Sequence, residues 1–539
     1  MKRINYILMA ILTILGLACT DKLDENNVTD VTAESHYTTA EGWEDGVNAV
    51  YERLRRYYGR EEGFTVSVFG TDIYTKGADG GRKAVNDYTA ALNPDESYFR
   101  NIWNWFYEAI NTGNTVIDFA ERDVVQGLDE GIKNVRIAEV RFLRAFYYFH
   151  LVQMYGDVHF TLEATVDVET EANRTPAEQI YTEGIIPDLE FAIANLPTVQ
   201  GDYGRATKPA AEAILARVHL VLENWDEAER LAKNVINYSD FDLVRPWGQI
   251  WNQDNELNEE VVWSVQYTSD PFTNDGGSRG HLYFLAEYDK ILGMERDIAN
   301  GRPWKRFQPT PYFLSLYKTE MDRRYDEGFK VVWFANNQEN LPENMQLGDT
   351  AFYVVPYAVP DDIQKSKPYF WVDVDPASTD PEMSLRQINK RWFPSLNKFI
   401  DPERLTVQQT EGSRDFIVVR LAEMYLLVAE ALMMQGKVDE GVQYINEIRR
   451  RAAWEGKEAD MEITAGELDL DFILEERARE LAGEKFRWFD LKRTGTLLER
   501  VRLHNPDASP NIEDFHRLRP IPRDQIDRTS NEYPQNPGY

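Results

Sequence analysis

The chain of 539 residues contains a single cysteine, Cys19, so it cannot form a disulfide within itself. It is also poor in positive charge, because 59 Lys and Arg residues face 91 Asp and Glu residues and leave a formal net charge of −32. Such a field repels nucleic acid and anionic lipid surfaces. It weakly disfavours strongly anionic polysaccharides as well, although one local basic cleft could override it.

Long apolar runs are missing after the first 18 residues, since no later stretch approaches the roughly 18 apolar residues of a membrane-spanning helix. The one early run, 7–18, follows Lys2 and Arg3 and is typical of a secretory signal peptide. It ends in G-L-A-C before the polar T-D-K-L-D-E-N-N, which predicts cleavage before Cys19 and acylation of that cysteine. An ordinary signal peptide with a chance cysteine is the alternative.

Motifs for metal or nucleotide chemistry are also missing. The seven histidines show no H-E-x-x-H spacing, and there is no G-x-x-x-x-G-K-[ST] phosphate loop. G-G-S-R-G at 276–280 fits G-x-S-x-G formally, but polar residues precede it where a nucleophile elbow needs an apolar strand, so we interpret it as a flexible loop. The acidic loop 252–260 leaves a weak case for structural calcium, without EF-hand spacing. No cofactor is expected otherwise.

Acidic residues are abundant, and hydrolysis of glycans would need two of them facing a cleft about 5 to 10 Å apart. The densest acidic group lies in 475–493, where charges of opposite sign alternate at helical spacing. The group comprises Glu476, Arg479, Glu480, Arg487, Asp490 and Arg493. Alternating charges neutralise one another, so the pattern predicts a structural ion-pair network rather than a catalytic pair.

Helical periodicity dominates both ends of the chain. The predicted helices are 39–58, 98–121, 131–155, 176–195, 206–223, 225–237, 415–435, 438–453 and 469–501. Two helix pairs repeat a spacing of twelve residues between small side chains, Ala216 with Ala228 and Ala429 with Gly441. Small residues at these points let two helices cross closely, as in tetratricopeptide repeats.

The segment 240–400 has a different character, with short strands, long loops and seven of the thirteen tryptophans. An aromatic-rich insertion between rigid helices is the natural place for a ligand surface. For any single tryptophan, burial in the core is the more frequent role. We therefore predict a mainly α protein with one domain over 38–539, helices at about 39–238 and 415–501, and a polar tether at 19–37.

Several segments resemble the SusD/RagB family of nutrient-uptake outer-membrane lipoproteins, in the expected order along nearly the whole chain. They are R-F-L-R-A-F-Y-Y-F-H-L-V-Q-M-Y-G-D-V (141–158), G-R-A-T-K-P-A-A-E-A-I-L-A-R-V-H-L (204–220), R-L-A-E-M-Y-L-L-V-A-E-A-L (420–432), the charged segment 475–493, P-I-P-R-D-Q-I-D (520–527) and P-Q-N-P-G-Y (534–539). The resemblance implies a SusD-like fold, in which four tetratricopeptide-like helix pairs support a loop-rich, aromatic-rich ligand face with short strands.

The resemblance also implies a function. The protein would be anchored on the outer membrane, exposed at the cell surface, and would deliver a polysaccharide or oligosaccharide to a SusC-like TonB-dependent transporter without catalysis. In such proteins, ligand residues come from the loop after the first helix and from the large insertion. The candidates here are Asp72, Tyr74, Trp304, Phe307, Trp333, Asn336, Trp371 and Arg386, with Arg302 and Arg306 as further donors.

Two other functions stay open at this stage. Tetratricopeptide-like helices could form a protein-interaction scaffold on the outer membrane, and a surface glycoside hydrolase would need an acid pair that the pattern does not identify. The sequence does not name the glycan, although the acidic composition slightly favours a neutral polymer such as a glucan, xylan or arabinan.

Overall fold

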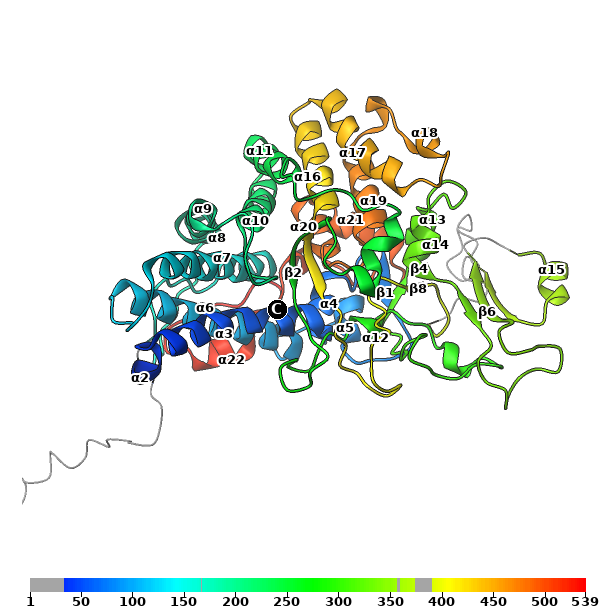
Figure 1. The fold of residues 1–539 in the computed structure, drawn as a ribbon, viewed down its shortest axis with the longest axis horizontal. Helices are drawn as coiled ribbons and strands as arrows, with labels where there is room; N and C mark the ends of the chain where they lie inside the picture. Colours follow the sequence, from blue (N-terminus) through cyan, green and yellow to red (C-terminus); the bar gives the residue numbers. More distant parts are fainter. Residues whose placement is uncertain (1–32, 166, 356–358, 374–389) are drawn as a thin grey trace, which may run out of the picture.

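The computed structural model describes residues 33–539 except 166, 356–358 and 374–389. Figure 1 shows long helices on the left and at the top, with the strands of the insertion towards the right. The predicted signal peptide, Cys19 and Arg386 lie outside the described residues. Within the described part, no helix has both the length and the apolar character needed to cross a membrane.

The N-terminal helices follow the predicted pattern closely. They are α2 (Ala33–Tyr37), α3 (Ala40–Gly59), α4 (Glu61–Ser67), α6 (Ser97–Glu121) and α7 (Glu130–Tyr155). Thr39 caps α3 by accepting a hydrogen bond from the Gly42 N–H, and Asp129 caps α7 in the same way. Helix α2 precedes the predicted start of structure near Thr38, so the last residues of the predicted polar tether, 33–37, are helical.

The middle helices are confirmed with one interruption. The predicted helix 176–195 consists of α8 (Ala177–Ile180), a π-helical turn η1 (Tyr181–Ile185) and α9 (Ile186–Asn195). It is followed by α10 (Lys208–Val221) and α11 (Trp225–Ile236). Helices α10, α11, α16 and α17 pack in series, so each covers the apolar face of the previous one.

The C-terminal helices are α16 (Leu421–Met434), α17 (Val438–Ala452), α19 (Leu470–Leu481), α20 (Arg487–Arg493) and α21 (Leu497–His504). Two predicted boundaries are wrong. Residues Phe416–Arg420 form strand β9, because they pair with β2 (Val261–Val265) instead of extending α16. The predicted helix 469–501 breaks after Leu481, where Gly483 and Lys485 have φ angles of 79° and 69°.

The predicted close helix crossing is confirmed at Gly441, where an added Cβ would lie 3.0 Å from the Ala429 carbonyl oxygen. Ala216 and Ala228 are fully buried at the equivalent places. The division of the helices into four tetratricopeptide-like pairs stays a prediction.

Strands of the insertion are short and pair across long sequence separations. β1 (Tyr74–Lys76) pairs with β3 (Phe307–Pro309), and β4 (Phe329–Lys330) pairs with β8 (Ser395–Leu396). β5 (Val332–Phe334), β6 (Thr350–Val355) and β7 (Phe370–Asp373) form a three-stranded sheet. The remaining short helices are α5 (Lys83–Asp87), α12 (Gly280–Tyr283), α13 (Pro311–Ser315), α14 (Arg324–Gly328), α15 (Asp361–Ser366), α18 (Glu458–Met461) and α22 (Arg523–Arg528).

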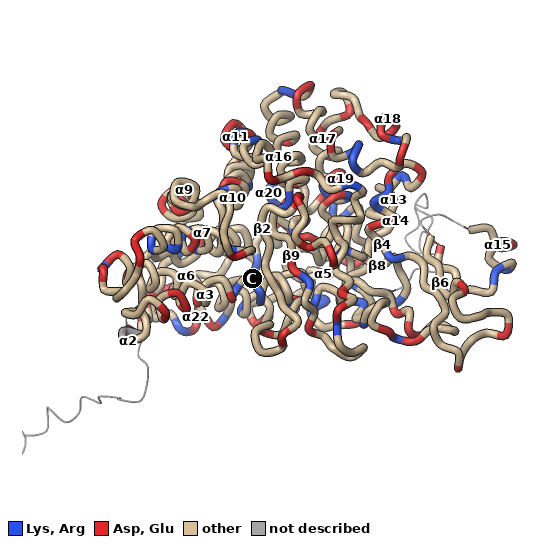
Figure 2. The backbone as a smooth tube through the Cα atoms, viewed as in Figure 1, with Lys and Arg blue, Asp and Glu red and all other residues tan. Residues whose placement is uncertain are grey.

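The charged segment 475–493 forms a structural ion-pair network, as its alternating signs predict, and the structure places most of it inside the molecule. Glu480 is fully buried and accepts hydrogen bonds from Arg324 (3.0 Å), Arg420 (2.6 Å) and Arg451 (2.6 Å). Glu476 is equally buried and pairs with Arg324, Arg449 and Arg479. We call these side chains the buried ion network. Other acidic residues lie along the outer helices α9, α11, α17 and α18 (Figure 2).

Candidate functional site

The pairing of β1 with β3 brings two distant parts of the chain to one place. Tyr74 lies opposite Pro309, and Lys76 lies opposite Phe307. Beyond the strands, the Gly77 N–H donates to the Arg306 carbonyl (2.9 Å) and the Ala78 N–H donates to the Lys390 carbonyl (2.6 Å). Segments 77–82, 302–306 and 390–392 therefore lie side by side, and we call their exposed and partly exposed residues the loop surface.

Trp304 is one of the two aromatic side chains of the loop surface. It is partly exposed, and its backbone N–H donates to the Leu282 carbonyl (2.9 Å). The guanidinium carbons of Arg306 and Arg302 lie 4.9 and 5.8 Å from the centre of its ring. These cation–π contacts hold the indole in place while part of it stays open to solvent.

Charged groups lie beside Arg306, the nearer of the two arginines that contact this indole. Arg306 lies 3.2 Å from a carboxylate oxygen of Glu61 and 3.5 Å from one of Asp79. Burial raises the pKa of Glu61, although the charge of Arg306 opposes the shift. The guanidinium of Arg82 lies 5.2 Å from the ring centre of Tyr98. The loop surface thus combines a flat ring with the carboxylate of Asp79 and the guanidinium groups of Arg82, Arg302 and Arg306.

Trp392 is a second partly exposed indole at the loop surface, and the residue candidates chosen from the sequence missed it. Its ring meets Phe370 edge to face at 4.9 Å, and its Nε1 donates to the Glu287 carbonyl at 3.3 Å. The Glu287 carboxylate accepts from Lys305 (2.6 Å) and Arg391 (2.5 Å). Burial would raise the pKa of Glu287, but these two cations outweigh it and lower the pKa.

Three of the predicted contacts lie beneath the loop surface. Asp72 is fully buried and accepts from Arg487 (2.7 and 2.5 Å) and Arg500 (2.9 Å). Burial alone would raise the pKa of Asp72, but these two arginines outweigh it and lower the pKa. Tyr74 and Phe307 are buried in the core between the strands and the helices. In this geometry the three side chains support the surface from below, so it gives no support for them as direct ligand contacts.

The other described candidates belong to the β5–β6–β7 sheet and its neighbouring loop. Trp333 is fully buried and stacks on Phe352 at 4.6 Å. Trp371 is only 9% exposed and packs against Tyr369 at 4.8 Å. The Asn336 amide donates to the Glu295 carbonyl (3.0 Å) and to Asp297 (2.6 Å). The structure does not bring these residues together with Trp304 in one sheet.

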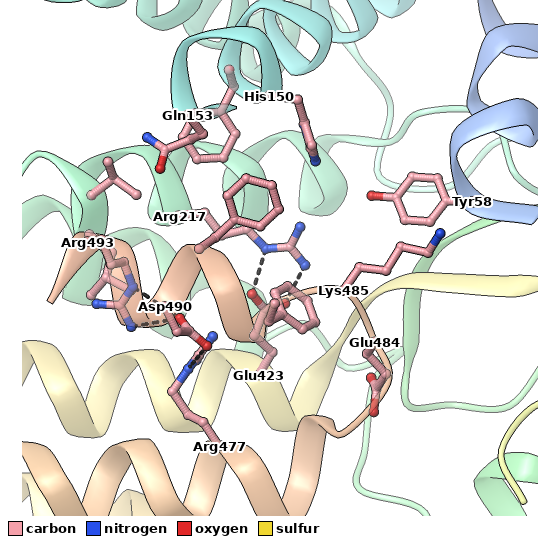
Figure 3. Close-up of a pocket in the computed structure, with 15 residues that line it drawn as sticks. Tyr58, His150, Gln153, Arg217, Glu423, Arg477, Glu484, Lys485, Asp490 and Arg493 are labelled. Carbon is pink, nitrogen blue, oxygen red and sulfur yellow. Dashed lines mark hydrogen bonds and ion pairs between the residues drawn. The ribbon is translucent and has the colours of Figure 1, made fainter. Parts of the chain in front are cut away.

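A pocket of about 60 Å³ lies between α7, α10, α16 and α20 (Figure 3). Figure 3 shows Arg217 facing Glu423, an ion pair with a distance of 2.5 Å. Burial lowers the pKa of His150 to about 4 and lowers that of Lys485 strongly. The volume is far below the roughly 300 Å³ of small-ligand pockets, so this pocket does not fit a sugar chain.

The structure also locates the two motifs that were considered for nucleophile and calcium chemistry. Ser278 of G-G-S-R-G forms a bridge with Gly412, and the preceding residues 266–277, all described, contain no strand. In 252–260, Asn252 accepts a hydrogen bond from the Asp254 N–H. The described residues include no group of three or more His, Cys, Asp or Glu side chains that could hold a metal. The calcium expectation stays untested.

Glu256 and Asp415 are carboxyl groups whose pKa values are raised, to about 7 and about 6, mainly by burial. The Asp415 N–H donates to Glu256 at 3.0 Å. Both line a cavity of about 20 Å³ under Trp251 and Phe416, which has no room for a sugar ring. They therefore do not form an accessible acid pair in this geometry.

This pair predicts a pH effect on stability. Because the folded state keeps protons that the unfolded state releases, the contribution of Glu256 to stability is present below about pH 4 and is lost as pH rises through about 7. Glu256→Gln removes the titrating carboxyl, so the variant should lose less stability than wild type as pH rises. We expect a difference of only about 1 kcal/mol, because the Glu256 side chain is partly open to solvent. Urea unfolding at pH 4.5 and 7.5 measures it, with exposed Glu259→Gln as control. Equal slopes for both variants and wild type would contradict the prediction.

Comparison with known proteins agrees with the fold. Residues 259–539, more than half of the chain, match the family model described as the SusD family. Residues 30–220 match a second family model, described as starch-binding associating with outer membrane. SusD-like protein P2 of Formosa agariphila is 29% identical over 561 residues, which cover 100% of this chain and 99% of that protein.

Solved structures share the architecture. A laminarin binding SusD-like protein has 24% sequence identity and a TM-score of 0.71, over 93% of this chain and 100% of that one. Surface glycan-binding protein A from Bacteroides thetaiotaomicron, in complex with laminarihexaose, has 20% identity and a TM-score of 0.69, with the same coverage. The family model, the full-length relative and the common fold confirm the resemblance found in the sequence, and this chain belongs to the SusD family.

Proposed function

We propose that this protein captures a glycan at the cell surface through the loop surface and passes it uncleaved to a SusC-like TonB-dependent outer-membrane transporter. Acyl chains on Cys19 would hold it on the outer membrane, since two or more chains suffice for stable anchoring. The observation that carries the proposal is Trp304, a partly exposed indole fixed by two arginines, with carboxylates beside Arg306.

The chemistry of the loop surface fits a sugar. Pyranose rings have apolar faces that stack on flat aromatic rings and hydroxyl edges that hydrogen-bond to carboxylate, amide and guanidinium groups. Trp304 offers the flat face, Arg306 lies against it, and the carboxylates of Glu61 and Asp79 lie beside Arg306. The names of the similar structures, which refer to laminarin and laminarihexaose, support a glycan as the ligand class.

Binding without cleavage is part of the proposal. The densest acidic segment is neutralised by the buried ion network, and the carboxyls with raised pKa at Glu256 and Asp415 line a cavity too small for a sugar. Incubation with a bound polysaccharide should release no new reducing ends. Their appearance would instead favour a surface glycoside hydrolase.

The central test is Trp304→Ala. Loss of the stacking ring should weaken glycan binding by about thirtyfold, corresponding to roughly 2 kcal/mol for a tryptophan anchor. Affinity gels with laminarin, starch, xylan and arabinan, followed by calorimetry on the best ligand, measure the change.

Trp454→Ala is the matched control. Trp454 is also partly exposed and has a guanidinium, that of Arg323, at 5.1 Å from its ring, but it lies beyond α17 on the helical side. Its removal should leave glycan affinity unchanged. Equal losses for both variants, or no binding by wild type, would argue against the loop surface as the glycan site, and the second result would favour a protein-interaction scaffold.

A further inference from the structure

A groove of about 390 Å³ lies between α3 and the segment 202–205, with β2 and the residue after it as its floor. Asn48, Tyr51 and Arg55 line it from α3, Tyr203 and Arg205 from the segment, and Gln266 from the floor. None of its lining residues belongs to the loop surface, and in Figure 1 α3 and β2 lie to the left of α12 and β1. Its volume is within the range of small-ligand sites, about 300 to 1,000 Å³.

The wall formed by 202–205 is held rigidly. Gly204 has a φ of +89°, and an added Cβ would lie only 1.3 Å from Gln266 Oε1. The backbone at Gly204 therefore packs directly against the Gln266 side chain, with no room for another residue's side chain. The Gly204 carbonyl accepts a hydrogen bond from Trp263 Nε1 at 3.0 Å. Arg205 pairs with Glu44 (2.6 Å), Glu139 (2.8 Å) and Asp202 (3.2 Å). A wall that is already ordered loses little entropy when a ligand binds.

Tyr203 stands on this wall with 45% of its surface exposed. It also lines a second hollow of about 140 Å³, formed with Phe241 and Trp263, and both hollows share residues 202–205. Tyr203 therefore forms part of the lining of both hollows. An exposed aromatic ring on a fixed backbone is a platform for the apolar face of a sugar.

Hydrogen-bonding groups line the groove beside this ring. Asn48 Oδ1 accepts from Arg205 (3.0 Å), and Arg55 donates to the Gln266 and Thr273 carbonyls (2.8 and 2.6 Å). Among the residues that the structure describes, none hydrogen-bonds to Asn48 Nδ2 or Arg55 Nη2, so both can donate to a ligand. The side chain of Asp202 is 75% exposed, so its carboxylate can accept hydrogen bonds from a ligand.

The formal charges of the groove lining balance, because its charged residues are two acids and two arginines, namely Glu52, Asp202, Arg55 and Arg205. A balanced lining offers no net attraction to a strongly charged ligand. From the platform, the free donors and this balance, we propose that the groove is a second saccharide site for a neutral oligosaccharide. This inference rests on the proposed function of the loop surface.

Hydrogen exchange of the whole protein with laminarin, starch, xylan and arabinan in turn tests the second site. At least one glycan should slow exchange in 48–55, 202–205 and 264–266, in addition to 77–82 and 302–306. Tyr203→Ala should weaken binding in the groove about tenfold and so shift protection of the first three segments to about tenfold higher glycan concentration, whereas Trp304→Ala should leave that protection unchanged. Tyr444→Ala, a partly exposed tyrosine on α17, is the control, and Asn48→Ala is a second groove variant.

The outcomes separate the two proposals. Protection of 77–82 and 302–306 alone overturns the second site and leaves the proposed function standing. Protection of the groove alone supports the second site and overturns the role of Trp304. Protection of neither by any of the four glycans overturns both, and groove protection whose concentration dependence neither Tyr203→Ala nor Asn48→Ala changes also overturns the second site.

Discussion

Glu480→Gln should lower the free energy of unfolding by about 3 to 5 kcal/mol, the range for breaking a buried ion pair by removing one partner. The Glu480 carboxylate faces three guanidinium groups, of Arg324, Arg420 and Arg451, and also accepts from Trp247 Nε1 (3.0 Å). Removing its charge would leave these cations short of compensation in a region without solvent. Burial would raise the pKa of Glu480, but the surrounding cations outweigh burial and lower the pKa strongly. The carboxylate therefore stays ionised and balances part of their charge.

Urea unfolding at pH 7 measures the change, with Glu227→Gln as the matched control. Glu227 pairs with Arg230 at 2.7 Å, but this pair lies on the surface of α11, where such pairs contribute about 0 to 1 kcal/mol. If the two variants lost equal stability, the buried ion network would not have the role assigned to it.

Asp72→Asn should also cost about 3 to 5 kcal/mol, because Arg487 and Arg500 would keep their charges without the buried carboxylate that balances them. The folded fraction should bind glycan as wild type does, since Asp72 lies below the loop surface and does not reach it. Urea unfolding and affinity gels on the same sample separate the two effects.

Asp95→Asn is the control for this variant, because Asp95 forms an exposed pair with Arg523. It should change neither stability nor binding measurably. An Asp72→Asn protein with wild-type stability and lost glycan affinity would reverse the assignment and return Asp72 to the ligand contacts named from the sequence.

Helices could be predicted well because their signal is local. Apolar spacing identified α3, α6 and α7 nearly to the residue, and alternating charge identified the buried ion network. The break after Leu481 was missed, although Gly483, a common helix-ending residue, could have indicated it. The sequence could not show that Arg324 and Arg420 belong to this network, because they come from distant segments of the chain.

Strand pairings were harder because they depend on residues far away. Residues 416–420 continue a helical pattern in sequence, and only β2, more than 150 residues earlier, makes them a strand. The same limit applies to the site. The two segments that the sequence selected do meet, through β1 and β3, but their register decides that Tyr74 and Phe307 face inward while Trp304 faces solvent. Tyr203 lies in a short G-D-Y-G-R turn that carries no binding motif.

The contacts of Asp72 reach across 415 residues to Arg487 and 428 residues to Arg500. A growing polypeptide therefore holds an uncompensated acid near its beginning until synthesis reaches the last tenth of the chain. Fragments that stop short of Arg487 should behave as unfinished, protease-sensitive chains, and the two halves of this protein cannot be expected to mature one after the other.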